Sequence, residues 1–204
     1  MNSTSINKNL SANPTLFFEY GDRDLSFRYI VSAREGIILK EEQFKVLKTL
    51  SEATSRMDLN AFAEKVNLTS NQTINQIQEL AKEGFLQRVG GGYGITQKGR
   101  SALKALSVFP SEMSFRFYFG LDKPSELTAW SLAEFYRFIK QISVESIEFH
   151  LDRGDFQTWF KDACKDPEMA SELERVKAEG FKGEALRVEI LKLLDGKYSL
   201  EGLI

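Results

Sequence analysis

The sequence has few of the residues that carry covalent or metal chemistry. Its single cysteine, Cys164, excludes an intrachain disulfide framework, and its single histidine, His150, excludes a metal site built from several imidazoles. No phosphate-binding P-loop occurs, and no serine or cysteine lies in a glycine-flanked nucleophile elbow. We therefore expect a protein that is not an enzyme, with no catalytic residues, no metal and no cofactor.

Long apolar runs are also missing. No stretch approaches the roughly 20 apolar residues that a membrane-spanning helix needs. The first residues, MNSTSINKNLSANP, lack the basic and apolar regions of a signal peptide. Together with the scarcity of cysteine, these absences predict a cytoplasmic protein that makes no contact with a membrane.

The composition is that of an ordinary globular protein, with 42% hydrophobic and 27% charged residues in a chain of 204. The net charge of −2 is unevenly distributed along the chain. Residues 1–109 hold 14 Lys and Arg against 11 Asp and Glu, whereas residues 110–204 hold 13 against 18. Because attraction to phosphate depends on the local field, the basic first half is the place to look for a nucleic-acid partner.

The beginning of the chain predicts an arm and a hairpin. Residues 1–14 are polar and are expected to form a flexible arm. Residues 15–31 contain apolar and aromatic runs separated by Gly21, Asp22 and Asp24, a pattern typical of a β-hairpin. This hairpin is more apolar than an isolated ribbon should be, so we expect it to pack on its own domain or on a second copy.

Helices are expected between residues 40 and 84. Apolar residues at helical spacing predict one from Lys40, and Asp58 is expected to cap the next, over residues 59–67. Thr69 or Ser70 is expected to cap a third, which ends at Gly84. The buried face of this third helix is expected to comprise Ile74, Ile77, Leu80 and Ala81.

Two short strands are then expected around the glycines at 90–92, followed by a helix that begins near Thr96. The sequence LNAFAEKVNLTSNQTINQIQELAKEGFLQRVGGGYGITQKGRSAL carries this pattern. With the preceding helix, the order over residues 40–106 resembles a winged helix-turn-helix, a DNA-binding family. The whole unit is expected to span residues 15–109.

The resemblance implies that the third helix enters the major groove of duplex DNA and that the hairpin contacts the backbone or the minor groove. The side chains placed to read base edges are Ser70, Asn71, Gln72, Asn75 and Gln76. Those placed at phosphates are Thr69, Arg88, Lys98 and Arg100, with Tyr93 near the hairpin tip. Asn and Gln match the donor and acceptor edge of adenine, which favours A·T sequences.

The third helix departs from the family's usual pattern because its leading turns carry no Arg or Lys. Affinity from one copy should therefore be low, and a homodimer would double the number of phosphate contacts. The alternative hypothesis is a protein-interaction adaptor that uses the same fold without DNA. In that case the Asn and Gln residues form a solvated helix face.

The second half, residues 110–204, is expected to be a helical domain led by one strand. Phe115, Phe117 and Phe119 alternate with polar residues and predict one apolar strand face. Ser125 is expected to cap a helix that runs through Ile139, and four more helices are expected to follow it. The fold class predicted for the whole chain is mainly α with small β, that is, α+β.

The stretch FHLDRGDFQTW, residues 149–159, has two interpretations. In the structural one, Gly154 ends a helix, Asp155 caps the next, and His150 lies at the margin of the core beside a carboxylate such as Asp155. In the enzymatic one, His150 acts as acid or base, with Asp155 or Glu148 orienting it and Arg153 holding an anion. The lack of a second polar cluster with catalytic spacing favours the structural interpretation.

The string F-H-x-x-R-x-D-F-x-x-W, within residues 113–195, also resembles a small helical domain of undefined function found in archaeal proteins. That resemblance implies an accessory module and no chemistry. The sequence as a whole therefore predicts an archaeal DNA-binding transcriptional regulator. Its partners are expected to be double-stranded DNA, a second copy as a homodimer, and a protein recruited by residues 110–204.

Overall fold

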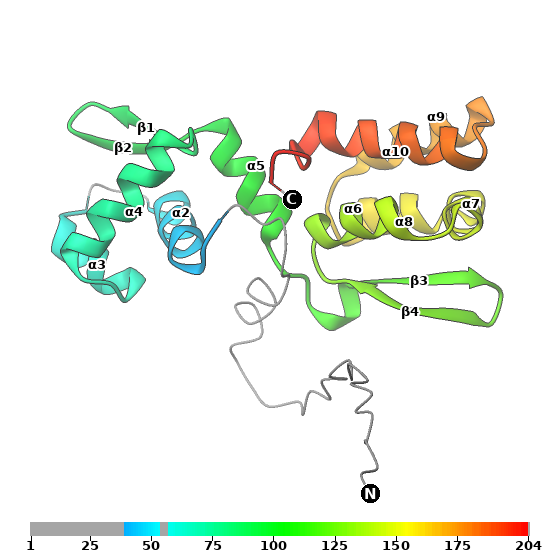
Figure 1. Ribbon diagram of the computed structural model, residues 1–204, viewed down its shortest axis with the longest axis horizontal. Coiled ribbons are helices and arrows are strands. Elements are labelled where there is room, and N and C mark those ends of the chain that lie inside the picture. The colour runs from blue at the N-terminus through cyan, green and yellow to red at the C-terminus, as the bar shows by residue number, and fades with distance from the viewer. Residues whose placement is uncertain (1–38, 54–56, 204) are drawn as a thin grey trace, which may run out of the picture.

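The computed structural model describes residues 39–53 and 57–203, and its order of elements is shown in Figure 1. Within these ranges the chain is mainly helical and contains two small antiparallel hairpins. This confirms the predicted α+β class. The arm predicted at 1–14 and the hairpin predicted at 15–31 lie outside the described residues.

The first group of elements has the predicted order of helix, helix, helix, hairpin, helix. It consists of α2 (Glu41–Glu52), α3 (Leu59–Val66), α4 (Ser70–Lys82), β1 (Leu86–Val89), β2 (Gly92–Ile95) and α5 (Gln97–Leu106). Asp58 caps α3, Thr69 caps α4 and Thr96 caps α5, each by accepting a backbone N–H bond. The caps explain why the helices begin where the sequence predicts.

The buried face of α4 differs from the prediction. Thr73 and Leu80 are fully buried, whereas Ile74 keeps 36% of its surface exposed. The Thr73 hydroxyl donates to the Thr69 carbonyl at 2.9 Å, so its polar group is satisfied inside the helix. A threonine can therefore occupy the core position, and the buried stripe is rotated away from Ile74.

The second group contains η1 (Ser111–Met113), β3 (Phe115–Gly120), β4 (Lys123–Ala129), α6 (Leu132–Gln141), α7 (Val144–Arg153), α8 (Asp155–Asp162), α9 (Pro167–Glu179) and α10 (Gly183–Tyr198). Figure 1 shows these elements in layers, with the β3–β4 hairpin on one side of α6, α7 and α8, and α9 and α10 on the other. The hairpin forms its own two-stranded sheet.

The prediction of a single leading strand was wrong, as was the helix predicted from Ser125. Residues 123–129 form β4, and α6 begins only at Leu132, with Ser131 as its cap. A lone strand would leave its backbone groups unpaired, and the short turn through Asp122 (φ 56°) returns the chain antiparallel to β3. Pro124 is tolerated because both strands of a two-stranded sheet are edge strands, where a residue without a backbone N–H can be accommodated.

The apolar face of β3 is shorter than predicted. Phe115 and Phe117 are buried, but Phe119 is 50% exposed. The pairing with β4 shifts register on both sides of Tyr118, which breaks the alternation of faces before Phe119.

An aromatic cluster forms the core of the second group. Trp159 stacks on Phe135 with ring centroids 4.8 Å apart, and Phe156 meets Phe135 edge to face at 5.2 Å. The Trp159 indole N–H donates to the Met113 carbonyl at 2.7 Å, which satisfies its polar atom. Phe109, which follows α5, reaches the same ring at 5.4 Å.

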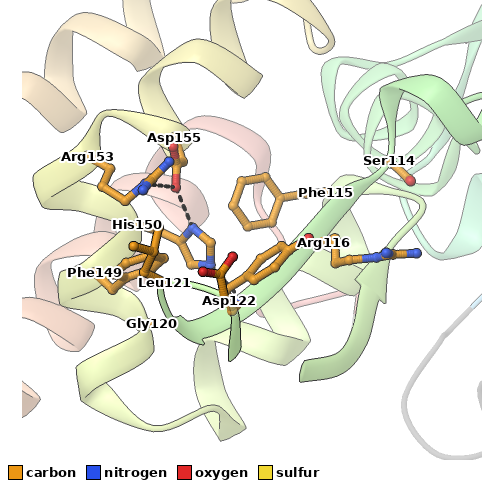
Figure 2. A pocket seen from close by; sticks show the side chains of 11 residues that line it. Ser114, Phe115, Arg116, Gly120, Leu121, Asp122, Phe149, His150, Arg153 and Asp155 are labelled. Atoms are coloured by element: carbon orange, nitrogen blue, oxygen red, sulfur yellow. Dashed lines mark hydrogen bonds and ion pairs between the residues drawn. The ribbon is translucent and has the colours of Figure 1, made fainter. Parts of the chain in front are cut away.

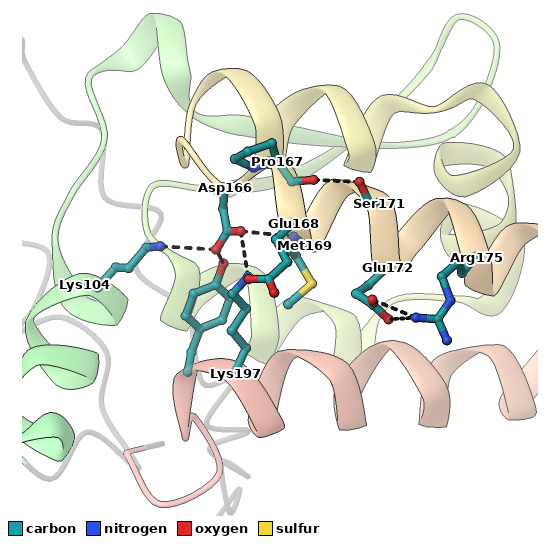
Figure 3. Close-up of polar contacts among 10 residues, drawn as sticks. Lys104, Asp166, Pro167, Glu168, Met169, Ser171, Glu172, Arg175 and Lys197 are labelled. Carbon is teal, nitrogen blue, oxygen red and sulfur yellow. Dashed lines mark hydrogen bonds and ion pairs between the residues drawn. The ribbon is translucent and has the colours of Figure 1, made fainter.

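The two groups also meet through Asp166, the N-cap of α9 (Figure 3). Its carboxylate accepts from Lys104 on α5 at 3.3 Å, and from Lys197 at 2.8 Å and the Tyr198 hydroxyl at 2.5 Å on α10. These bonds lower the Asp166 pKa although burial opposes them. The boundary predicted between residues 109 and 110 stays a prediction.

Within the described ranges, no helix is both long enough and apolar enough to cross a membrane.

Candidate functional site

The leading turn of α4 uses several of its polar groups internally. Gln72 accepts from the Thr69 N–H at 2.9 Å and from the Thr69 hydroxyl at 2.8 Å, completing a capping box. The Ser70 hydroxyl donates to Asn60 on α3 at 2.8 Å. Of the predicted contacts to DNA, Thr69, Ser70 and Gln72 therefore have structural partners.

Asn71 and Asn75 lie one turn apart on the exposed face of α4, and neither side chain bonds to a described residue. Gln76 is half-buried, and its Oε1 atom lies inside without a partner among the described residues. Since Asn71 and Asn75 present both amide donors and acceptors to solvent, they are the base-reading candidates left unoccupied.

The predicted phosphate contacts also divide into two kinds. Lys98 donates to the Glu83 carbonyl at the end of α4 at 2.8 Å, and Arg100 donates to the Ile95 carbonyl at the end of β2 at 2.9 Å. These two side chains hold α4 and the hairpin against α5. Arg88 pairs across the hairpin with Tyr93, and its guanidinium lies over that ring at 5.6 Å.

An apolar groove of about 760 Å³ is lined by residues from α2, α3, α4 and the β1–β2 hairpin. Ile74 and Gln78 of α4, and Gly91 and Gly92 of the hairpin, are among its lining residues. Sequence reasoning placed Ile74 in the core and missed Gln78, although helical spacing from Asn71 and Asn75 puts Gln78 on the same exposed face.

The second candidate site surrounds His150 (Figure 2). The ring is only 2% exposed, so it is buried and not at the core margin as predicted. Nε2 accepts the Tyr118 backbone N–H at 2.8 Å, and Nδ1 lies 2.8 Å from Asp155 Oδ2. The carboxylate partner confirms the prediction for Asp155. Glu148 accepts the Gly183 N–H instead of touching the ring.

These contacts fix the protonation of His150. An Nε2 atom that accepts an N–H bond carries no proton, so the proton of the neutral ring lies on Nδ1 and is donated to Asp155. Burial lowers the His150 pKa, although the bond that its Nδ1–H donates to Asp155 opposes the shift. A neutral ring with both nitrogens engaged cannot act as a general base without breaking the fold around Tyr118.

Asp155 is the first residue of α8, and Gly154, in the left-handed conformation at φ 80°, takes the N-cap position. The prediction that Asp155 caps α8 was therefore wrong. Its carboxylate is directed instead to His150 and to Arg153, whose Nε lies 3.3 Å away. Phe149, which is half-buried, lines a cleft of about 410 Å³ with His150 and Arg153.

Cys164 and the acidic residues bear on nucleophile and metal sites among the described residues. The Cys164 thiol is buried, which raises its pKa to about 12 and keeps it protonated. No group of three or more His, Cys, Asp or Glu side chains among the described residues could hold a metal ion.

No protein-family model, curated protein or solved structure matches this chain. Function must therefore be inferred from the geometry of the two candidate sites.

Proposed function

We propose that this protein is a winged-helix, DNA-binding transcriptional regulator of the cytoplasm. The proposal is carried by one observation: Asn71 and Asn75 expose unoccupied amides on α4, beside a hairpin that carries Arg88. A helix whose first turns expose such groups can place them against base edges in a major groove.

The hairpin supplies the sequence-independent part of the proposed contact. Arg88 is exposed, and its stacking on Tyr93 leaves the guanidinium N–H groups able to reach a phosphate. Gly91 and Gly92 would meet no atom within 4 Å if they carried a Cβ, so the turn is uncrowded and its backbone can approach a sugar-phosphate chain. Together with α4, this gives one helix and one hairpin for each half-site.

The proposed regulator acts as a homodimer, because a single copy has few cations for phosphates. Lys98 and Arg100 are held by carbonyls of the same chain, and Glu79 and Glu83 lie at the far end of α4. Two copies double the phosphate contacts and steepen the salt dependence of binding. In this proposal, residues 110–204 serve dimerisation or recruit a protein partner.

The decisive experiment is selection of duplexes from a random library by the full chain, followed by fluorescence anisotropy on the selected sequence. Arg88→Ala should weaken binding, and Lys161→Ala is the matched control because Lys161 is an exposed cation on α8 with no ion pair to a described residue. Failure to enrich any sequence at low salt contradicts the proposal.

The adaptor alternative is favoured by one different observation, the apolar groove beside α4. Leu59 and Ile74 line it and are each more than one-third exposed. A protein partner seated there would bury them. Ile74→Ser separates the two functions, because it should weaken docking of an apolar partner while adding no charge beside the amides of α4.

A further inference from the structure

We propose that the cleft between β3 and the α7–α8 junction is a binding site for a small aromatic or apolar carboxylate. The cleft measures about 410 Å³, within the range of small-molecule sites. It lies in residues 110–204, apart from the proposed DNA-binding elements. The proposal therefore does not depend on DNA binding.

Arg153 is the group that recognises the carboxylate. Its Nε bonds to Asp155 at 3.3 Å, and its guanidinium lies over the Phe149 ring at 5.1 Å. Neither terminal nitrogen has a partner among the described residues, and the side chain is 51% exposed. Two contacts thus hold the guanidinium in place while its outer edge, which suits a two-point bond to a carboxylate, stays unoccupied.

His150 contributes to this arrangement without touching the ligand. Its Nδ1–H donates to Asp155 at 2.8 Å and holds that carboxylate in position (Figure 2). The same carboxylate accepts from Arg153 and orients its guanidinium. The buried ring is neutral, and the carboxylate of Asp155 is balanced by Arg153. The stretch that sequence analysis treated as a possible catalytic site is in this proposal a recognition site.

The other residues that line the cleft favour a ligand with an apolar part and a single negative charge. Tyr118, Leu121 and Phe149 line the cleft with apolar surface, and Leu121 is 71% exposed. Asp122 and Arg116 also line the cleft. Asp122 has no partner among the described residues, and the Arg116 guanidinium points away from Arg153 (Figure 2). The negative charge of Asp122 disfavours a doubly charged phosphate relative to a singly charged carboxylate. An apolar monocarboxylate fits both features.

The test is calorimetric titration of the full chain with benzoate, phenyl phosphate and acetate, together with the ligand-induced change in Tm. Benzoate should bind with a Kd of about 1 mM or tighter. At a free benzoate concentration about ten times the Kd, it should raise Tm by roughly 3–5 °C. Acetate should bind at least about tenfold more weakly because it lacks the apolar body. Tighter binding of phenyl phosphate than of benzoate overturns the carboxylate assignment.

Arg153→Gln should weaken benzoate binding by at least about tenfold, since the charged two-point bond is lost. The matched control is Arg175→Gln, which removes an exposed arginine on α9 that pairs only with Glu172 among the described residues and should leave binding unchanged. If Arg153→Gln does not fold, Arg153→Lys keeps the charge without the planar fork and should still weaken binding. Equal binding by the wild type and a folded Arg153 variant, or no benzoate binding to the wild type at about 10 mM, refutes the site.

Discussion

His150 and Tyr118 are joined by a hydrogen bond in which the Tyr118 backbone N–H donates to Nε2 at 2.8 Å. The Tyr118 carbonyl accepts from Ser146 at 2.6 Å, four residues before His150 on α7. Two side chains of one helix thus bond both backbone groups of a residue that lies on an edge strand, opposite Pro124 of β4. The histidine replaces part of a missing neighbouring strand.

Replacing His150 should therefore cost more stability than a marginal core residue would. His150→Ala leaves the Tyr118 N–H without an acceptor and opens a cavity, and we expect a loss of about 2–4 kcal/mol in the free energy of unfolding. His150→Gln can place an amide oxygen near the Nε2 position and should lose less. Urea unfolding of both variants checks this, and equal losses would show that the acceptor at Tyr118 is unimportant.

Stability should fall as the pH is lowered through the range where histidine titrates. The folded-state pKa of His150 lies below the unfolded value near 6.5, so the unfolded chain binds the proton more readily. The loss begins as the pH falls to about 6.5 and is complete below the folded pKa. The measurement is the free energy of unfolding against pH for the wild type and His150→Gln, whose difference should shrink toward acid pH. A constant difference contradicts the lowered pKa.

The stability that Asp166 contributes should be lost at a lower pH than the stability that depends on His150. Its folded-state pKa lies below the ordinary aspartate value of about 3.8, so its stabilisation is present above that pH and is lost as the pH falls below it. At neutral pH, Asp166→Asn should cost about 1–3 kcal/mol, because Lys104 and Lys197 lose their charged acceptor but stay partly solvated. Glu172→Gln, which breaks an exposed pair with Arg175, is the control and should cost about 0.5 kcal/mol or less.

Arg88 and Lys98 should affect DNA binding in different ways. Arg88→Ala should weaken binding to every sequence and reduce the salt slope by about one unit, as expected for a lost phosphate contact. Lys98→Ala should instead lower Tm, because Lys98 holds the Glu83 carbonyl, and should leave the salt slope unchanged. Anisotropy titrations at several salt concentrations and thermal unfolding distinguish them. A reduced slope for Lys98→Ala would restore it as a phosphate contact.

Asn75→Ala should relax base preference at one position of the selected site, at a cost of roughly 1–3 kcal/mol for the preferred base. Gln72→Ala is the comparison, because Gln72 is engaged in the cap of α4 and should affect helix stability more than base preference. Binding measured on single-base variants of the selected duplex gives the result. Unchanged preference in Asn75→Ala would remove that residue from the interface.

Local signals in the sequence determined much of the helical part of this protein. Asp58, Thr69 and Thr96 were each predicted at helix starts, and each caps its helix. Such caps are readable because the side chain bonds to a backbone N–H two or three residues away. The exposure of Asn71 and Asn75 follows in the same way from the period of a single helix.

Contacts between distant segments were decided only by the tertiary structure. Residues 123–129 form a strand because β3 needs a neighbour, although the local sequence favours a helix from Ser125. His150 is buried because Tyr118, far away in sequence, offers it a backbone N–H. Lys98 and Arg100 are cations whose spacing suits phosphate, but carbonyls at the ends of α4 and β2 lie within reach of them. Sequence spacing specifies what a side chain can bond to, whereas the packing of elements determines which partner is present.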